Sequence, residues 1–262
     1  MKSRLVEVDG QRLNVATRDG EGTPLLLATG IGAHIEMWGP FARRLNGRPL
    51  IAFDAPGTGR SPAAPLRMRG LARLVSRLLD GLGYDRVDAL GYSFGGALVQ
   101  EFAHRHPERL RRLVLCATTP GLGSVPPKPV AGLLLLTPAR YYHPALFRLT
   151  VPRIAGGRTR RDRAVLDAQA TARLAHAPSP LGYAFQLYAA AGWSSLPWLH
   201  RLRAPTLVVA GDDDPVIPLA NARLLARRIP DAQLHVVRGG GHLFLLDEPE
   251  SAVAEIQSFL GR

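Results

Sequence analysis

Residues 91–95 read Gly-Tyr-Ser-Phe-Gly, and this G-x-S-x-G pentapeptide decides the fold. The apolar run Val87–Leu90 precedes it and Gly96–Val99 follows it, which predicts a strand, a very tight turn and a helix in succession. Glycine is expected at both ends because a Cβ there would collide with the neighbouring strand or helix. Such a turn lifts the serine hydroxyl out of the sheet, towards a helix N-terminus whose N–H groups can hold an oxyanion. Ser93 is therefore predicted to be a nucleophile.

The composition is that of one large globular domain. The 262 residues are 46% hydrophobic and 21% charged, which is enough to bury a substantial core. No apolar run is long enough to span a bilayer, and the N-terminus carries no apolar signal core, so a cytoplasmic location is expected. The single cysteine, Cys116, lies in the apolar run Leu113–Ala117 and is predicted to be a buried strand thiol. No Cys/His spacing indicates a structural metal.

The formal net charge of +12 admits more than one interpretation. A basic surface can bind nucleic acid, but no aromatic stacking motif or helix-turn-helix signature accompanies the charge. The basic residues are nearly all arginine and are spread along predicted helices. We therefore expect a solvated arginine-rich surface and no nucleic-acid partner. Attraction to an anionic surface is the third possibility.

Apolar and amphipathic segments alternate as a parallel-sheet protein requires. A hairpin is expected around Asp9-Gly10. The later predicted strands, besides the one before Ser93, are Pro24–Ala28, Pro49–Asp54, Leu110–Ala117, Pro205–Ala210 and Gln233–Val237. The helical period predicts amphipathic helices over Leu71–Leu82 and Ser251–Leu260.

Residues 120–197 have a different character. They are rich in proline and aromatic residues, contain short helical stretches such as Arg163–Ala175 and Tyr183–Ala191, and show no buried-strand pattern. An insertion between two strands, on the carboxyl edge of the sheet, would lie over the active site. We therefore expect a helical cap at 120–197 and a core formed by 1–119 and 198–262. The aromatic residues of the cap predict an apolar pocket, in which Trp193 is a candidate substrate contact.

A serine nucleophile needs a base and an acid that orients it. Of the eight histidines, His242 is the one in a glycine-rich loop just past the last predicted strand, which makes it the candidate base. Three adjacent aspartates, Asp212, Asp213 and Asp214, follow the predicted strand Pro205–Ala210, and any of them could supply the acid. His34, in the loop after the first buried strand, and Tyr92, next to the serine, are further candidates for substrate contact.

The motifs resemble those of the α/β-hydrolase superfamily and, within it, the intracellular medium-chain-length polyhydroxyalkanoate (PHA) depolymerases. The likeness covers nearly the whole chain and is carried by residues 91–98, 193–200, 210–219, 228–235 and 241–245. It implies an α/β-hydrolase fold, with a mostly parallel central sheet, helices on both faces and a helical cap insertion. One departure is that Tyr and Phe flank Ser93 where that family more often has Val and Trp.

The resemblance also implies roles for individual residues. The family's acid stands four residues before a proline, and Asp214 with Pro218 has this spacing, so the implied triad is Ser93, Asp214 and His242. The implied oxyanion hole consists of the backbone N–H groups of Phe94 and Ile31. Asp54 corresponds to a structural turn of the family.

The implied activity is that of a serine hydrolase that cleaves ester bonds of medium-chain-length poly(3-hydroxyalkanoate) through an acyl-enzyme. The resemblance implies no metal and no organic cofactor. The expected partner is a hydrophobic polyester or medium-chain ester, with contact to storage granules as a further possibility. The same triad also fits a general carboxylesterase or lipase, a C–C bond hydrolase or a cofactor-free haloperoxidase. A non-catalytic granule-coat or receptor protein on this scaffold is the alternative from another class. Such proteins commonly lose a triad member, whereas all three candidates are present here.

Overall fold

An eight-stranded sheet forms the centre of the protein in the computed structural model, which describes residues 1–45, 47–247 and 250–261. The strand order is β1-β2-β4-β3-β5-β6-β7-β8, in which β2 runs antiparallel to both neighbours and the strands from β4 to β8 run parallel. The strands are β1 (Lys2–Val8), β2 (Gln11–Arg18), β3 (Leu25–Ala28), β4 (Leu50–Phe53), β5 (Val87–Tyr92), β6 (Leu110–Cys116), β7 (Thr206–Gly211) and β8 (Ala232–Val237). This is the mostly parallel sheet that the sequence predicted.

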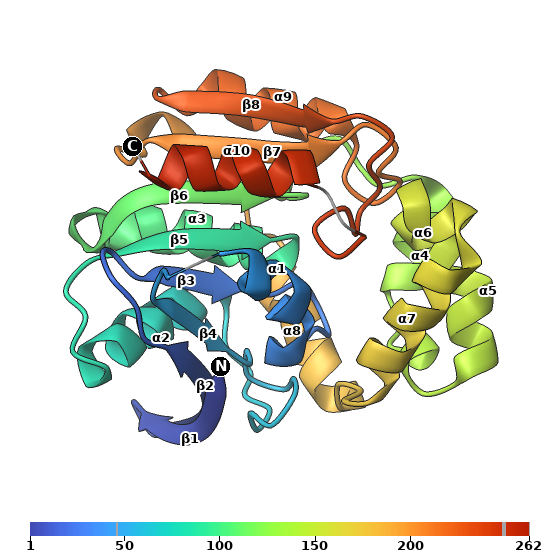
Figure 1. The fold of residues 1–262 in the computed structure, drawn as a ribbon, viewed down its shortest axis with the longest axis horizontal. Coiled ribbons are helices and arrows are strands. Elements are labelled where there is room, and N and C mark those ends of the chain that lie inside the picture. The colour runs from blue at the N-terminus through green and yellow to red at the C-terminus, as the bar shows by residue number, and fades with distance from the viewer. Residues whose placement is uncertain (46, 248–249, 262) are drawn as a thin grey trace.

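Helices cover both faces of the sheet (Figure 1). One face carries α1 (Gly39–Arg44) and α10 (Glu250–Gly261), and the other carries α2 (Met68–Gly81), α3 (Phe94–Arg105) and α9 (Leu219–Arg228). Short 3₁₀ helices are η1 (Ile35–Trp38), η2 (Pro107–Arg109) and η4 (Leu199–Arg201). Strands β3, β4, β5 and β7 are buried throughout, which explains why they read as continuous apolar runs. No helix in the described ranges has the length and apolar character needed to cross a membrane.

Helix ends differ from the predicted ones for identifiable reasons. The helix predicted from Leu71 begins at Met68, three residues earlier, where the Met68 side chain is buried on the same face. The helix predicted from Tyr183 begins at Pro180, because Ser179 caps it by accepting a 2.9 Å hydrogen bond from the N–H of Gly182. Periodicity marks the apolar face of a helix, whereas the first turn of the helix from Pro180 is set by its capping residue, Ser179.

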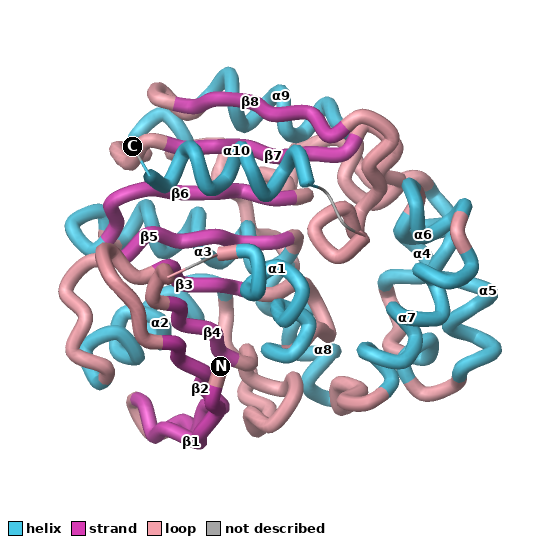
Figure 2. The backbone as a smooth tube through the Cα atoms, in the orientation of Figure 1, coloured by secondary structure: helices cyan, strands magenta, loops and turns pink. Residues whose placement is uncertain are grey.

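The segment between β6 and β7 is helical. It contains α4 (Pro129–Leu135), η3 (Ala139–Tyr141), α5 (Pro144–Ala155), α6 (Gly157–Arg161), α7 (Arg163–Leu174) and α8 (Pro180–Ala190). Figure 2 shows α4, α5, α6 and α7 gathered beside the strands, at one end of the sheet. The sequence had predicted α7 and α8. It did not predict α4 and α5, each of which begins with proline, and α5 also contains Pro152.

The two ends of this segment are fastened to each other. An isolated antiparallel bridge joins Gly121 to Ser194, the N–H of Leu122 donates to the carbonyl of Trp193 at 2.8 Å, and Ser195 N–H donates to Pro120 at 2.8 Å. A Cβ on Gly121, whose φ is +85°, would lie 2.3 Å from the Trp193 carbonyl oxygen. The insertion therefore leaves the sheet and returns to it at one place.

Asp54, at the end of β4, organises the turn that follows. Its carboxylate accepts hydrogen bonds from Asn14 Nδ2 at 2.7 Å, from Ile35 N–H at 2.8 Å and from Arg60 N–H at 3.0 Å, and the residue is 1% exposed. These bonds agree with the structural role predicted for this carboxylate.

Candidate active site

Ser93 occupies the turn between β5 and α3 in a strained backbone conformation. Its φ and ψ are 55° and −116°, a region that residues with a side chain rarely adopt. The turn is held from β6: Ser93 N–H donates to the Cys116 carbonyl at 2.9 Å, and the Thr118 hydroxyl donates to the Ser93 carbonyl at 2.8 Å. Cys116 is fully buried, as predicted, and burial raises the pKa of its thiol.

The two glycines of the pentapeptide are required by close packing. A Cβ on Gly91 would lie 2.3 Å from Cγ2 of Val99, and a Cβ on Gly95 would lie 2.1 Å from the carbonyl oxygen of Ala28. The sequence predicted such collisions. Neighbouring atoms of the same protein therefore lie too close at both positions for any residue that has a Cβ.

Three side chains from three loops form a hydrogen-bonded chain. His242 Nε2 lies 3.1 Å from Ser93 Oγ, and His242 Nδ1 lies 2.8 Å from Asp214 Oδ2. The other Asp214 oxygen accepts the N–H groups of Val216 at 2.8 Å and Ile217 at 2.9 Å. The His242 side chain is 9% exposed and that of Asp214 is 1% exposed. An Nδ1–H donated to the carboxylate leaves Nε2 free to accept the serine proton.

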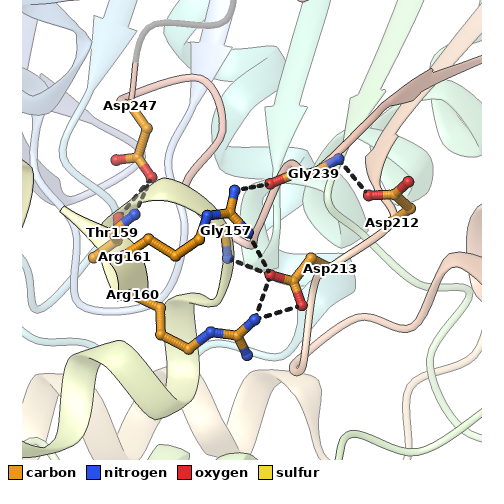
Figure 3. A network of polar contacts seen from close by, with 8 residues as sticks. All are labelled: Gly157, Thr159, Arg160, Arg161, Asp212, Asp213, Gly239 and Asp247. Atoms are coloured by element: carbon orange, nitrogen blue, oxygen red, sulfur yellow. Dashed lines mark hydrogen bonds and ion pairs between the residues drawn. The ribbon is translucent and has the colours of Figure 1, made fainter.

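The other two aspartates of the triplet have different partners (Figure 3). Asp213 lies 2.7 Å from the Arg160 guanidinium and accepts the N–H of Gly157 at 2.9 Å, while Asp212 accepts the N–H of Gly239 at 2.6 Å. Of the three carboxylates that the sequence offered, Asp214 is the one bonded to His242. Asp213 instead ties the loop after β7 to helix α6.

The junction between α5 and α6 packs directly on the loops that carry Asp214 and His242. A Cβ on Gly156 would lie 2.1 Å from the Asp213 carbonyl oxygen, and one on Gly157 would lie 2.2 Å from the Gly241 nitrogen. The backbone N–H of His242 also donates to the carbonyl of Ala155 at 2.5 Å. The inserted helices and the loops of the candidate acid and base therefore hold each other in place.

The two amides predicted to form an oxyanion hole lie at the same edge of the sheet. Phe94 is the first residue of α3, and Ile31 follows Gly30, whose Cβ would lie 3.4 Å from Cβ of Ser93. Among the described residues, neither amide N–H has a hydrogen-bond acceptor. Both therefore remain available to a substrate oxygen.

Side chains of the inserted helices brace the loop that carries Ile31. The hydroxyl of Tyr141 donates to the Ile31 carbonyl at 3.2 Å, and the Gly32 N–H donates to Oε1 of Gln186 at 2.8 Å. A Cβ on Gly32, whose φ is +68°, would lie 3.0 Å from the Tyr141 ring. The position of this loop thus depends on the insertion.

A cavity with about 680 Å³ of empty space, its opening included, reaches Ser93 and His242. From the sheet side it is lined by Thr29, Met37, Trp38, Tyr92, Leu243 and Leu245. From the inserted helices it is lined by Leu135, Arg140, Tyr141, Val151, Ile154 and Arg173. Most of the wall is apolar, with two arginines on one side.

Comparison with known proteins agrees with this geometry. A family model for the alpha/beta hydrolase fold matches residues 23–249. The chain belongs to this family. It is 47% identical to a poly(3-hydroxyalkanoate) depolymerase of Ectopseudomonas oleovorans, and the match covers 98% of this hydrolase and 92% of the relative. A solved hydrolase from Pseudomonas aeruginosa PA01 superposes with a TM-score of 0.84 at 27% identity, covering 99% and 98% of the two chains. An enol-lactonase from Burkholderia xenovorans LB400 gives 0.84 at 26% identity, with 99% and 100% coverage.

Of the three predicted pocket residues, the hydrolase places Tyr92 in the cavity wall and the other two elsewhere. His34 is buried beneath α7, with Nε2 3.2 Å from the Ala172 carbonyl and its ring against that of His176. Trp193 is not among the residues that line the cavity, and its indole N–H donates to Glu101 of α3 at 2.9 Å. Residue type and place in the chain, on which both predictions rest, do not reveal side-chain direction.

No sequence pattern points to the two arginines of the cavity wall. Arg140 and Arg173 are 5% and 9% exposed, although arginine is usually a surface residue. An apolar pattern cannot predict buried cations, and many other arginines of the chain lie on exposed helices. Within the described ranges, no cluster of three His, Cys, Asp or Glu side chains has the arrangement needed to hold a metal ion.

Proposed function

We propose that this hydrolase is a serine esterase that cleaves medium-chain-length poly(3-hydroxyalkanoate), with Ser93 as nucleophile, His242 as base and Asp214 as the orienting acid. The observation that carries the chemistry is the continuous chain from Ser93 Oγ to His242 at 3.1 Å and from His242 to Asp214 at 2.8 Å. Support for the substrate comes from the relative named poly(3-hydroxyalkanoate) depolymerase, which is similar over nearly its whole length.

The arrangement supports an acyl-enzyme mechanism. Ser93 Oγ attacks the ester carbonyl carbon while His242 Nε2 removes the hydroxyl proton. The amides of Phe94 and Ile31 receive the carbonyl oxygen as its charge develops. The C–O bond to the alcohol side then breaks, and His242 returns the proton to the departing alkoxide. Water attacks the acyl-enzyme with His242 again as base, which releases the acid and restores the serine.

The cavity wall favours an alkyl-bearing acyl group. Leucine, isoleucine and valine side chains face the same space as Ser93, from both the sheet and the inserted helices. Burial of a medium-chain alkyl group against them would contribute about 0.8 kcal/mol for each methylene removed from water.

We further propose that residues 120–197 act as a cap over a core of 1–119 and 198–262, and that the cap meets polyester granules in the cytoplasm. This segment contains six large apolar side chains that are more than half exposed: Leu122, Val130, Leu133, Leu136, Leu149 and Leu181. An exposed apolar group of this kind is typical of a contact with another surface. Leu133→Ser with Leu136→Ser should lower co-sedimentation with granules and leave p-nitrophenyl octanoate turnover unchanged. Undiminished sedimentation would contradict granule contact through these residues.

The decisive experiment replaces the proposed nucleophile. Ser93→Ala should lower kcat on p-nitrophenyl octanoate by about 10⁴-fold or more and abolish clearing of a medium-chain polyester suspension. Its circular dichroism should match that of the wild type. Ser251→Ala, on the exposed side of α10, is the matched control and should remain fully active. Turnover retained by Ser93→Ala would overturn the assignment. Octanoate ester hydrolysis without polymer clearing by the wild type would instead identify a general carboxylesterase.

A further inference from the structure

We propose that Arg173 binds a free carboxylate of the substrate inside the Ser93 cavity, so that the enzyme acts on the acid end of hydroxyacyl chains and on short acidic oligomers. This inference rests on the proposed ester hydrolysis and names the form of substrate. In a hydroxyacyl chain, the terminal carboxylate belongs to the alcohol side of the last ester bond. Its recognition would therefore direct Ser93 to the ester that releases one hydroxy acid.

Arg173 offers an unused donor to the cavity. It lies in α7, is 9% exposed and lines the same cavity as Ser93. Its Nε donates to Gln169 Oε1 at 3.4 Å, and Nη1 donates to the Tyr141 hydroxyl at 3.4 Å. Nη2 has no partner among the described residues, and it is not one of the buried polar atoms sealed away from solvent.

No carboxylate of the described chain neutralises this cation directly. The nearby Asp247 accepts hydrogen bonds from the Thr159 hydroxyl at 2.6 Å and from Gln169 Nε2 at 3.1 Å, so Gln169 stands between Asp247 and Arg173. A poorly solvated guanidinium without a bound anion is costly, and an incoming carboxylate would lower that cost. Planar guanidinium groups also suit carboxylate geometry better than any other side chain.

Arg140, the other arginine of the cavity wall, is occupied in a different way. Its Nη1 donates to the carbonyls of Leu134 at 2.9 Å and Thr137 at 2.7 Å, and its Nη2 donates to the Tyr183 hydroxyl at 2.8 Å. These bonds hold the inserted helices together and use both terminal nitrogens. Arg140 adds positive charge to the cavity, while Arg173 has the donor to spare.

Two other polar groups of the cavity-lining residues lack a hydrogen-bond partner among the described residues. The indole N–H of Trp38 and the hydroxyl of Tyr92 are buried, line the cavity and have no hydrogen-bond partner in the described chain. Buried polar groups without partners are uncommon in native proteins. Burial raises the pKa of Tyr92, and the positive charge of Arg173 opposes this rise. Both atoms are closed off from solvent, so Arg173 Nη2 remains the accessible unpartnered donor of this wall.

The test compares acidic and neutral substrates in one variant. The substrates are the 3-hydroxyoctanoate dimer as free acid, its methyl ester, and p-nitrophenyl octanoate. The wild type should prefer the free acid to the methyl ester. Arg173→Gln should lower kcat/KM on the free acid about 10- to 100-fold, mainly through KM, as expected for a lost charge-assisted bond. The methyl ester and the octanoate ester should be hydrolysed at nearly wild-type rates.

Controls separate binding from folding. Arg173→Lys keeps the charge and should restore part of the activity on the free acid, while Arg163→Gln, an exposed arginine of the same helix, should change nothing. Inhibition by 3-hydroxyoctanoate should weaken in Arg173→Gln by the same factor as KM. Equal losses on all three substrates, or a wild type that does not distinguish acid from methyl ester, would overturn the proposal. Failure of the proposed function looks different, because all ester hydrolysis would then survive Ser93→Ala.

Discussion

The hydroxyl of Tyr141 donates a 3.2 Å hydrogen bond to the carbonyl oxygen of Ile31. A residue of the inserted helices thereby holds the residue whose amide we propose as an oxyanion donor. Burial alone would raise the pKa of Tyr141, but the charges of Arg140 and Arg173 outweigh it and lower the pKa.

Tyr141→Phe should lower kcat on p-nitrophenyl octanoate about tenfold with little change in KM, because the oxyanion loop loses a brace while the apolar ring stays in place. Tyr142→Phe is the matched control. Its hydroxyl donates to the Pro178 carbonyl at 2.5 Å, away from the oxyanion loop, and its loss should leave kcat unchanged. Equal effects of the two substitutions would contradict a specific role for Tyr141.

The three adjacent aspartates should separate in their kinetics. Asp214→Asn should lower kcat about 10⁴-fold, because the amide no longer holds the required His242 tautomer. Asp213→Asn should lower the free energy of unfolding by about 1 kcal/mol or less, since its pair with Arg160 is partly exposed, and it should keep most of the activity. Steady-state kinetics and urea denaturation of both variants check this. A larger loss of kcat in Asp213→Asn than in Asp214→Asn would show that Asp213, and not Asp214, is the acid.

Gly95→Ala should destabilise the protein by about 3 kcal/mol or more, because the added Cβ would lie 2.1 Å from the Ala28 carbonyl oxygen. Gly81→Ala is the control, since nothing lies within 4 Å of a Cβ at that helical position. It should be neutral or stabilising by up to about 1 kcal/mol. Urea midpoints give both values, and a stable, active Gly95→Ala would show that the elbow can relax.

Asp247 should make stability depend on pH. Burial raises its pKa above the ordinary 3.8, against the opposing bonds from Thr159 and Gln169. Between 3.8 and the raised value, the folded protein binds more protons at this site than the unfolded chain. The contribution of Asp247 to the free energy of unfolding therefore falls as pH rises through that window.

Urea denaturation of the wild type and Asp247→Asn at a series of pH values, from acidic to neutral, isolates this contribution. The wild type should lose stability relative to the variant as pH rises. A difference that stays constant, or that grows in favour of the wild type, would show that the folded-state pKa is not raised.

The sheet, and the choice of Ser93 and His242 as nucleophile and base, were predicted from local patterns. A glycine on each side of Ser93 and a glycine-rich loop before His242 are short-range signals that a single sequence carries. The parallel order of strands then brings their carboxyl ends to one edge. Asp214 needed the family's proline spacing, because three identical side chains in a row carry no pattern that distinguishes them.

The cavity wall could not be predicted in the same way. Arg173 and Tyr141 line the same cavity as Ser93, and they are placed there by short helices whose packing follows no period in the sequence. Trp193 illustrates the difficulty, since its indole bonds to Glu101 and faces away from the cavity that its aromatic character suggested. Side-chain direction in the insertion is decided by long-range contacts, such as those of Arg140 with Leu134 and Tyr183.

The Gly121–Ser194 bridge joins the two ends of the insertion, so that both ends are connected to the sheet at the same place. Because both ends leave the sheet side by side, another insertion of different length can be grafted there without altering the spacing of the strands. The contacts of Gly156 and Gly157 with the acid and base loops set the condition for such a transplant. A foreign insertion must carry its own glycine pair where Gly156 and Gly157 pack, or it will displace the loops that carry Asp214 and His242.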